Sequence, residues 1–282
     1  MVKSNTIRII GIISIFLFLI IISITTLLPL IFLVIASFKP AIELFRFGLS
    51  FNIDISKLTL KNYEFIFSRE GSRFTTWFFN SIKITVVYVI ISLFFSSMVG
   101  YALGVYHFKG KRILFYMVLF TMMLPIELLI LPLYKEMVYF KLIDTCGGVI
   151  LPFAVSPMAV FFFRQYASTL PKELMDSARI DGCSEYRIYF QIMMPLMLPA
   201  IGAMVILLGM NSWNSFIWPL IVLRSEEKFT LPIGLSALLT PYGNDYETLI
   251  AGSVVSILPV LILFIFNQRA FISGLTLGGI KG

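Results

Sequence analysis

Two asparagines, Asn211 and Asn214, lie among tryptophan and phenylalanine residues in the segment NSWNSFIWPL (211–220), which is otherwise apolar. Each amide can donate and accept hydrogen bonds, and the aromatic rings offer flat apolar faces. Sugars expose hydroxyl groups at their edges and C–H groups on their faces, so this combination suits a wall that contacts a sugar. The alternative is that the asparagines bond to neighbouring helices while Trp218 belongs to an interfacial aromatic belt.

A single carboxylate, Glu127, lies in a second apolar segment, TMMLPIELLILPLY (121–134), between Pro125 and Pro132. A carboxylate at membrane depth is costly unless it faces a partner or a water-filled cavity. Both prolines are expected to interrupt the helix and to free carbonyl groups toward such a cavity. We therefore expect Glu127 to accept hydrogen bonds from substrate hydroxyl groups. A structural hydrogen bond to a neighbouring helix or to Lys83 is the alternative.

A charged stretch separates two membrane-length apolar runs: PKELMDSARIDGCSEYRIYFQIMMPLMLP (171–199). Pro171 opens it, Asp181 and Gly182 interrupt it, and two prolines close it. Glycine suits the left-handed conformation that commonly ends a helix, and an aspartate before it stabilises a turn. The pattern predicts a helix–turn–helix outside the bilayer.

Apolar residues recur in both halves of this stretch at helical spacing. In the first half, Leu174 and Ala178 are four residues apart. In the second half four residues repeat as i, i+3, i+4 and i+7, the pattern of one helix face; they are Tyr186, Tyr189, Phe190 and Met193. Such helices can bind in a groove of a soluble partner and transmit force to the membrane. A helix lying among lipid headgroups is the alternative.

The elements that position these residues are transmembrane helices. The chain of 282 residues is 59% hydrophobic and 13% charged, whereas soluble domains are about 45–50% apolar and about 25% charged. A spanning helix needs roughly 20 apolar residues, and the apolar runs are continuous, not alternating. The sequence predicts an all-α polytopic membrane protein with about six spans: 9–36, 79–106, 113–134, 148–163, 196–223 and 248–266.

The first span follows Lys3 and Arg8 and is too long for a cleaved signal sequence, so we expect a retained signal-anchor helix. With the N-terminus inside, acidic residues gather mainly in the outer segments, and the basic loop 107–112 lies inside, which favours this orientation. The stretch 171–193 and the C-terminus are then also cytoplasmic. An amphipathic helix is expected on the outer surface at 58–67.

Small residues mark one face of the second span, because Ser96, Gly100 and Gly104 recur every four residues. Small-residue stripes let two helix backbones approach closely in a membrane. We interpret this stripe as a packing surface.

Several functions are not supported by the sequence. The passage GVYHFKGKR (104–112) lacks the spacing of a phosphate-binding loop, so we expect no ATP binding by this chain. The single histidine, His107, cannot form a metal site, and the scattered basic residues form no nucleic-acid-binding stripe. Cys146 and Cys183 lie on opposite sides of the fourth span and are expected to be unpaired.

The charged stretch resembles the "EAA" loop of ABC importer permeases, whose pattern is E-A-A, two residues, D-G-A, and then a spaced Phe, Pro and Pro. The chain departs from it by Asp for Glu, Ser for Ala and Cys for the later Ala, while the spacing is kept. The matching residues are Asp176, Ser177, Ala178, Asp181, Gly182, Cys183, Phe190, Pro195 and Pro199.

Within the ABC importer permeases, the chain resembles the carbohydrate-uptake branch, of maltose and multi-sugar type. Passages from about residue 55 to the C-terminus carry this resemblance. They are NYEFIF, Asn80-Ser81, YAL with FKGK, the proline-flanked Glu127 with PLY, WNSFIWPL and QRAFISGLTLGGIKG. It implies the type I ABC importer fold. It also implies an N-terminal helix with outer loop (1–75), a permease core (76–267) containing the coupling loop 171–193, and a cytoplasmic tail (268–282).

The implied partners are a second permease, two cytoplasmic ATPase subunits that bind ATP and Mg²⁺, and an extracytoplasmic sugar-binding protein, assembled in a bacterial cytoplasmic membrane. In the family the loop transmits closure of the ATPases to the helices, and the glycine-rich tail at 278–282 reaches the ATPase interface. An ion-coupled secondary carrier remains the alternative, with Glu127 its only candidate for a proton or sodium site; duplicated halves, which such carriers often have, are not evident.

Overall fold

Helices account for nearly all regular structure in the computed structural model, which describes residues 2–40, 54, 57–68, 73–240 and 243–276. The chain forms two units: Met1–Phe74 with Leu235–Ser256, and Thr75–Gly234 with Ile257–Gly282. The only strands in the described part are β1 (Leu239–Thr240) and β2 (Gly243–Asn244), paired antiparallel. The expected all-α architecture is confirmed.

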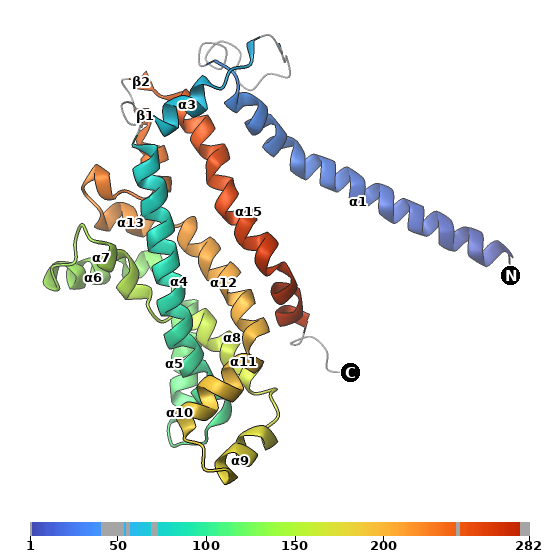
Figure 1. The fold of residues 1–282 in the computed structure, drawn as a ribbon, viewed down its shortest axis with the longest axis vertical. Helices are drawn as coiled ribbons and strands as arrows, with labels where there is room; N and C mark the ends of the chain where they lie inside the picture. Colours follow the sequence, from blue (N-terminus) through green and yellow to red (C-terminus); the bar gives the residue numbers. More distant parts are fainter. Residues whose placement is uncertain (1, 41–53, 55–56, 69–72, 241–242, 277–282) are drawn as a thin grey trace. The chain divides into compact units, whose positions relative to one another are not determined.

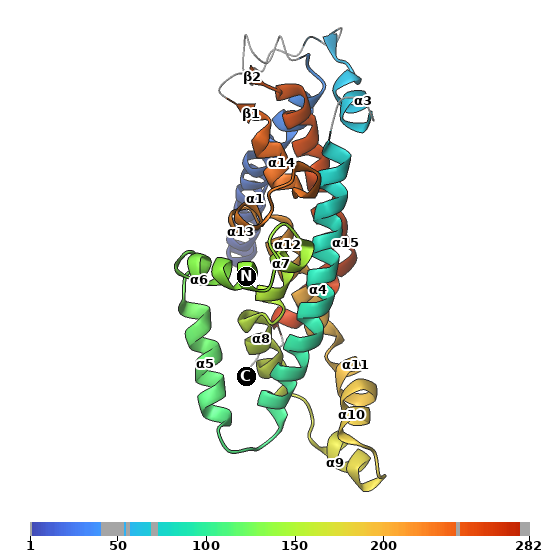
Figure 2. The same cartoon turned by 90° about the vertical axis from the view of Figure 1, so that its left-hand side faces the viewer.

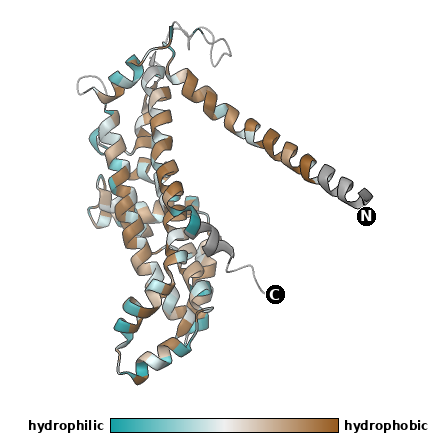
Figure 3. Ribbon diagram, turned by 45° about the vertical axis from the view of Figure 1, so that its right-hand side comes forward, coloured by the Kyte–Doolittle hydropathy of each residue, from teal (hydrophilic) through white to brown (hydrophobic). Residues whose placement is uncertain are grey.

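Three long helices in the described ranges are apolar enough to cross a membrane. They are α1 (Val2–Ser37), α4 (Phe74–Val105) and α15 (Tyr246–Thr276). Three further pairs of helices qualify if each bent pair counts as one span, which gives up to six. The long helices are hydrophobic along most of their length, and hydrophilic residues gather in the short helices and loops (Figure 3).

The expected third span, 113–134, is not one straight helix. Helices α5 (Lys111–Met123) and α6 (Ile126–Tyr139) meet at 104°. Pro125 has no N–H and disfavours helical backbone in the residue before it, and both Leu124 and Pro125 are extended. The same expectation was wrong for Pro132, because α6 continues through it; an internal proline removes one hydrogen bond without always ending the helix.

The fourth expected span consists of α7 (Cys146–Ile150) with η2 (Leu151–Phe153), followed after a 43° bend by α8 (Pro157–Ala167). The fifth, 196–223, is also interrupted. Helix α12 (Leu198–Trp213) ends before α13 (Ile217–Val222), and residues 214–216 lie between them. Polar groups of the segment 211–220 therefore lie around the end of α12.

The small-residue stripe of α4 packs against α8, as the sequence predicts. A Cβ on Gly100 would lie 2.6 Å from Phe163 Cβ and 2.8 Å from the Val160 carbonyl oxygen. At Gly104 the nearest atom would be Ala167 Cβ, at 2.9 Å. Ser96 Oγ accepts a hydrogen bond from the Ser156 amide at 3.0 Å. Close backbone approach thus fixes α4 to α8 (Figure 2).

Beyond α8 the chain forms a helical hairpin at one end of the second unit (Figure 1). Its first arm is α9 (Glu173–Ile180), and its second arm comprises α10 (Glu185–Arg187), the π-helix η3 (Ile188–Met193) and α11 (Met194–Leu196). Helix α11 leads into α12. Two short helices, η4 (Glu226–Lys228) and α14 (Leu231–Ala237), follow α13 in the chain.

In the first unit, the amphipathic helix expected at 58–67 is α3 (Lys61–Phe67), which begins three residues later. Asn62 Nδ2 donates hydrogen bonds to the carbonyl oxygens of Ser37 and Lys39 at 2.8 and 3.0 Å. Tyr63 and Ser37 share a side-chain hydrogen bond of 2.6 Å. These bonds fix α3 to the end of α1.

Candidate functional site

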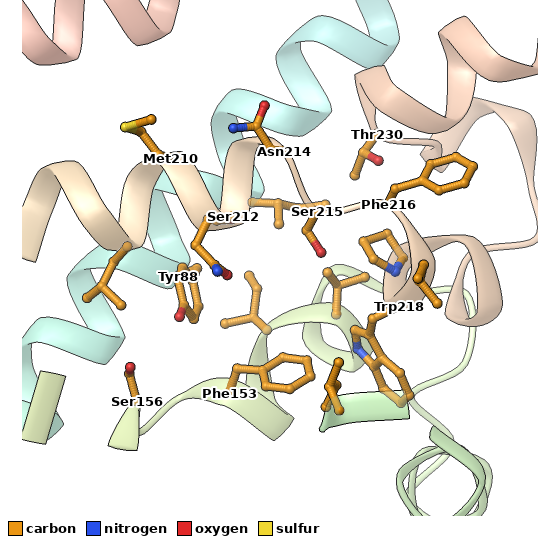
Figure 4. A pocket seen from close by; sticks show the side chains of 18 of the residues that line it. Tyr88, Phe153, Ser156, Met210, Ser212, Asn214, Ser215, Phe216, Trp218 and Thr230 are labelled. Carbon is orange, nitrogen blue, oxygen red and sulfur yellow. The ribbon is translucent and has the colours of Figure 1, made fainter. Parts of the chain in front are cut away.

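A cavity of about 840 Å³ opens between α4, α6, the α7–η2 turn, α12 and α13 of the second unit. Asn211 and Ser212 from the last turn of α12 line it, and so do Asn214 and Ser215 from the break after α12. The structure thus brings together the two asparagines that the sequence singled out. Both asparagines reach the cavity because the fifth span is interrupted there. Ser212, Asn214 and Ser215 lie at or just beyond the end of α12 (Figure 4).

Aromatic rings form other parts of the wall: Tyr88 from α4, Phe153 from η2 and Trp218 from α13 (Figure 4). The Trp218 indole donates a hydrogen bond to the Gly148 carbonyl at 3.1 Å, and the Phe153 ring meets it edge-on at 5.9 Å. Trp218 is therefore a buried, fixed wall residue and not an exposed membrane-belt residue.

Trp213 and Glu127, which the sequence analysis also associated with a substrate pathway, do not line this cavity. Trp213 is buried, with its ring edge-on to Phe78 at 5.7 Å, and does not line the cavity. Glu127 lies exposed in the first turn of α6, whereas Ile126 and Ile130 of that helix face the cavity. The structure therefore does not bring Glu127 together with the asparagines. None of the residues lining the cavity carries a formal charge.

The turn of the hairpin has the geometry that its sequence predicts. Gly182 adopts φ +78°, which is left-handed and strained for residues with a side chain. The Gly182 amide donates to the Arg179 carbonyl at 3.0 Å and the Cys183 amide to the Ala178 carbonyl at 2.9 Å. Ser184 Oγ then accepts from the Arg187 amide at 3.4 Å to begin α10.

Arg179 joins the two arms of the hairpin, a role that the sequence reasoning missed. Its Nε and Nη2 atoms donate to the Glu185 carboxylate at 2.7 and 3.2 Å, and Nη1 donates to Asp176 at 3.0 Å. The Tyr106 hydroxyl, just beyond α4, donates to the same Glu185 carboxylate at 2.7 Å. Hydrogen bonds from Arg179 and then Tyr106 lower the pKa of Glu185. The hairpin is therefore tied to the end of α4.

The expected apolar face of the second arm is partly wrong. Tyr189 and Met193 are buried, but Tyr186 and Phe190 are exposed and Ile188 takes a buried place. Residues 188–193 form a π-helix, which has more residues per turn than the α-helix assumed in the sequence pattern. On the first arm, Met175 joins Ala178 in the core while Leu174 stays exposed.

The other residues of the resembling pattern lie as follows. Asp176, Ser177, Asp181 and Pro195 are exposed, and Cys183 is half-buried. Phe190 stacks on Phe94 of α4 with ring centroids 6.5 Å apart. Both cysteines are free, as expected. The tail at 278–282 lies outside the described residues.

A second polar cluster fixes the loop after α6 to the loop after α13. Asp144 accepts hydrogen bonds from the Arg224 and Ser225 amides at 2.9 and 3.1 Å, from Ser225 Oγ at 2.6 Å and from Lys228 Nζ at 2.9 Å. Burial by itself would raise the pKa of Asp144, but these hydrogen bonds outweigh it and hold the pKa well below its usual range. Its partners lie about eighty residues away, so no local sequence signal indicated the cluster.

Comparison with known proteins places these features in a family context. The family described as "Binding-protein-dependent transport system inner membrane component" matches residues 92–271. The arabinooligosaccharides transport system permease protein AraQ of Bacillus subtilis is 57% identical over 270 residues, covering 96% of each chain. AraQ of Halalkalibacterium halodurans is 59% identical, covering 90% of this chain and 91% of the relative.

More distant similarities extend to a further relative and to a solved structure. The lactose transport system permease protein LacG of Rhizobium radiobacter is 35% identical, covering 72% of this chain and 74% of LacG. The crystal structure of a bacterial ABC transporter involved in import of the acidic polysaccharide alginate contains a similar chain. The TM-score is 0.79 at 25% identity, covering 94% of this chain and 97% of that one.

Proposed function

Because the chain belongs to the family of binding-protein-dependent transport system inner membrane components, we propose that it is the ABC importer permease through which an uncharged oligosaccharide crosses the cytoplasmic membrane. The observation that carries the substrate class is the cavity: amide- and hydroxyl-bearing residues at the end of α12 and aromatic residues line the same space, and no charged residue lines it. The names of its AraQ and LacG relatives support a sugar substrate.

The absence of charge in the cavity wall favours a neutral sugar over an acidic one. A carboxylate or phosphate loses much of its hydration in a cavity and needs a cation or several donors in return. Asn211 and Asn214 instead offer neutral amides, which suit hydroxyl groups. We expect Tyr88 and Trp218 to contact the C–H faces of the sugar rings.

We propose that the hairpin is the coupling element to two cytoplasmic ATPase subunits. The proposed contact residues are those of the resembling pattern that reach the surface, namely Asp176, Ser177, Asp181, Gly182, Cys183, Phe190 and Pro195, with Ala178 of the same pattern packed in the core beneath them. Exposed apolar residues near the turn support an interface: Ile180 is 87% and Tyr186 74% exposed. ATP and Mg²⁺ would be bound by these partners, and this chain would hold no cofactor itself.

Within the second unit the hairpin is connected to the cavity through α12, which follows the second arm at a 75° bend. The second arm leads through α11 into α12, whose 16 residues end at the cavity-lining asparagines. A helix of this length is rigid over about 24 Å. Closure of the ATPases would move the hairpin, tilt α12 and change access to the cavity, which is alternating access. A second permease subunit would complete the pathway, and a binding protein would deliver the sugar outside.

This assignment places the hairpin and both termini in the cytoplasm. The ion-coupled carrier is the weaker alternative, because Glu127, its only candidate ion site, does not line the cavity. Uptake into vesicles that contain the assembled transporter and enclosed ATP separates the two functions. We expect uptake to require ATP and to persist when ionophores remove proton and sodium gradients; uptake that follows an ion gradient without ATP would overturn the proposal.

The substrate role of the cavity is tested by Asn211→Ala and Asn214→Ala in the same vesicles, with the binding protein supplied. A lost hydrogen bond is worth about 0.5–1.5 kcal/mol, so each variant should lower uptake of the neutral oligosaccharide about 2- to 10-fold. Gln268→Ala removes an exposed amide of α15 and serves as the control. Unchanged uptake in the double variant would contradict a role for these amides in the pathway.

A further inference from the structure

A second cavity, of about 570 Å³, lies where α5 begins, beside α8. Three cationic side chains line it, Lys111, Arg112 and Arg164, and its other walls include Phe115 and Tyr116. We propose that this cavity binds a phosphate group, carried by an anionic phospholipid headgroup or present as free phosphate. This proposal concerns a different site from the sugar cavity and does not depend on it.

The charge balance of the cavity calls for an anion. None of its lining residues is a carboxylate, so three positive charges share one concave space without a counter-charge in its wall. Lys111 Nζ is held there by the carbonyl oxygen of Tyr106 at 2.8 Å and that of Gly104 at 3.4 Å. Like charges held together are unfavourable, and a bound anion relieves this repulsion.

Arg164 adds a fixed cation to the cavity wall. Its Nε atom is buried and has no hydrogen-bond partner among the described residues. A buried donor without an acceptor is costly. Its Nη1 atom donates to Gln165 at 2.8 Å, and the guanidinium lies 4.1 Å from the centre of the Phe115 ring, which fixes its plane. The positive charge of Arg164 is thus held in a fixed position beside the cavity.

The backbone of α5 favours the same ligand. Gly110, in a left-handed conformation with φ +89°, turns the chain so that α5 begins at Lys111. The Lys111 amide donates to the Phe108 carbonyl oxygen at 3.4 Å, whereas the next amides of a first helical turn have no acceptor within their own helix, and this end of a helix carries partial positive charge. Amides and cationic side chains on one cavity form the combination that binds phosphate groups.

Apolar walls indicate why a lipid is one source of that phosphate. Ile113 and Tyr116, which line the cavity, are 62% and 58% exposed on α5, where lipid chains can cover them. The turn between α4 and α5 lies at the same end of the second unit as the hairpin (Figure 2). In the proposed orientation this is the cytoplasmic side, where basic pockets between helices bind anionic headgroups.

The test uses the complete purified transporter in lipid nanodiscs. Binding of phosphatidylglycerol, phosphatidylcholine and inorganic phosphate is measured by native mass spectrometry and by equilibrium titration. The variants are Arg112→Gln, at an exposed position, and Arg164→Gln; Lys109→Gln removes a neighbouring cation that does not line the cavity. Elution of the assembled complex at its normal size shows that each variant folds.

We expect phosphatidylglycerol to bind at least tenfold more tightly than phosphatidylcholine, and both arginine variants to weaken this binding about tenfold while Lys109→Gln does not. If the arginine variants weaken binding of inorganic phosphate but not of phosphatidylglycerol, the proposed phosphate site is supported and its ligand is free phosphate. The proposal is overturned if Arg112→Gln binds both anions as the unaltered protein does, or if Lys109→Gln weakens binding equally.

Discussion

Gly182 is the residue at which the hairpin depends most on the absence of a side chain. No atom of this chain lies within 4 Å of the place where a Cβ would stand, so within the chain a substitution there acts through the backbone, whose φ is +78°. Left-handed backbone costs an ordinary residue about 1–2 kcal/mol, and a β-branched residue adopts it with more difficulty than asparagine does.

Gly182→Val should therefore distort the turn and uncouple ATP hydrolysis from transport, whereas Gly182→Asn should retain most activity. Sugar uptake and substrate-stimulated ATP hydrolysis of the assembled transporter, measured side by side, check this. Coupled transport at the normal rate in the valine variant would show that the turn geometry is not needed.

Asp144 acts at the same scale but depends on pH. Its folded pKa is lower than its unfolded value near 3.9, so the stabilisation by this group is complete above the unfolded pKa and is lost as pH falls toward the folded pKa. We expect Asp144→Asn to lower the thermal unfolding midpoint by a constant amount from about pH 6 to 8 and by a decreasing amount below about pH 4. A difference that grows on acidification would contradict this assignment.

Among the elements, the contact between α4 and α8 carries the clearest stability prediction. Gly100→Ala introduces a Cβ 2.6 Å from Phe163 Cβ and 2.8 Å from a backbone oxygen, so the helices must separate. Overpacking of this kind costs about 1–3 kcal/mol. We expect a lower unfolding temperature and less monodisperse protein in detergent.

The matched control for this substitution is Gly11→Ala in α1, where nothing lies within 4 Å of the added Cβ. Alanine favours helix over glycine by about 1 kcal/mol, so Gly11→Ala should be neutral or slightly stabilising. Equal effects of the two substitutions would show that the α4–α8 contact does not limit stability.

Sequence patterns predicted where helices lie better than where those helices are interrupted. The glycine stripe, the turn at Gly182 and the apolar runs follow from local periodicity and backbone preference. Local sequence could not distinguish Pro125, which ends a helix, from Pro132, which does not. The π-helix at 188–193 also has no periodic signature of its own and changed which aromatic residues of the hairpin are buried.

The sequence likewise identified some residues of the candidate sites and missed others. Asn211 and Asn214 could be identified because amides beside aromatic rings are conspicuous in an apolar segment, and both line the cavity. Glu127 was equally conspicuous but lies outside the cavity wall, because its direction depends on the 104° bend before α6. Arg179 and Asp144 act through partners in other segments, and only the fold shows these contacts.

On the scale of the whole molecule, the second unit combines an uncharged cavity with a charged hairpin. Its uncharged cavity is suited to a neutral sugar, and its hairpin is polar, hydrogen-bonded to the end of α4 by Tyr106 and Glu185. Helix α12 begins at a 75° bend after the hairpin arm and ends at the cavity, so we expect a force applied to the hairpin to reach the cavity wall. The proposed importer mechanism requires that a separate ATPase applies this force.

Site-specific photo-crosslinking from position 180 tests this requirement most directly. Ile180, 87% exposed at the end of α9, is replaced by benzoylphenylalanine in the transporter assembled in native membranes. We predict crosslinks to an ATP-hydrolysing subunit whose yield changes with bound nucleotide. Crosslinks confined to lipid, or to the extracytoplasmic binding protein, would contradict the account.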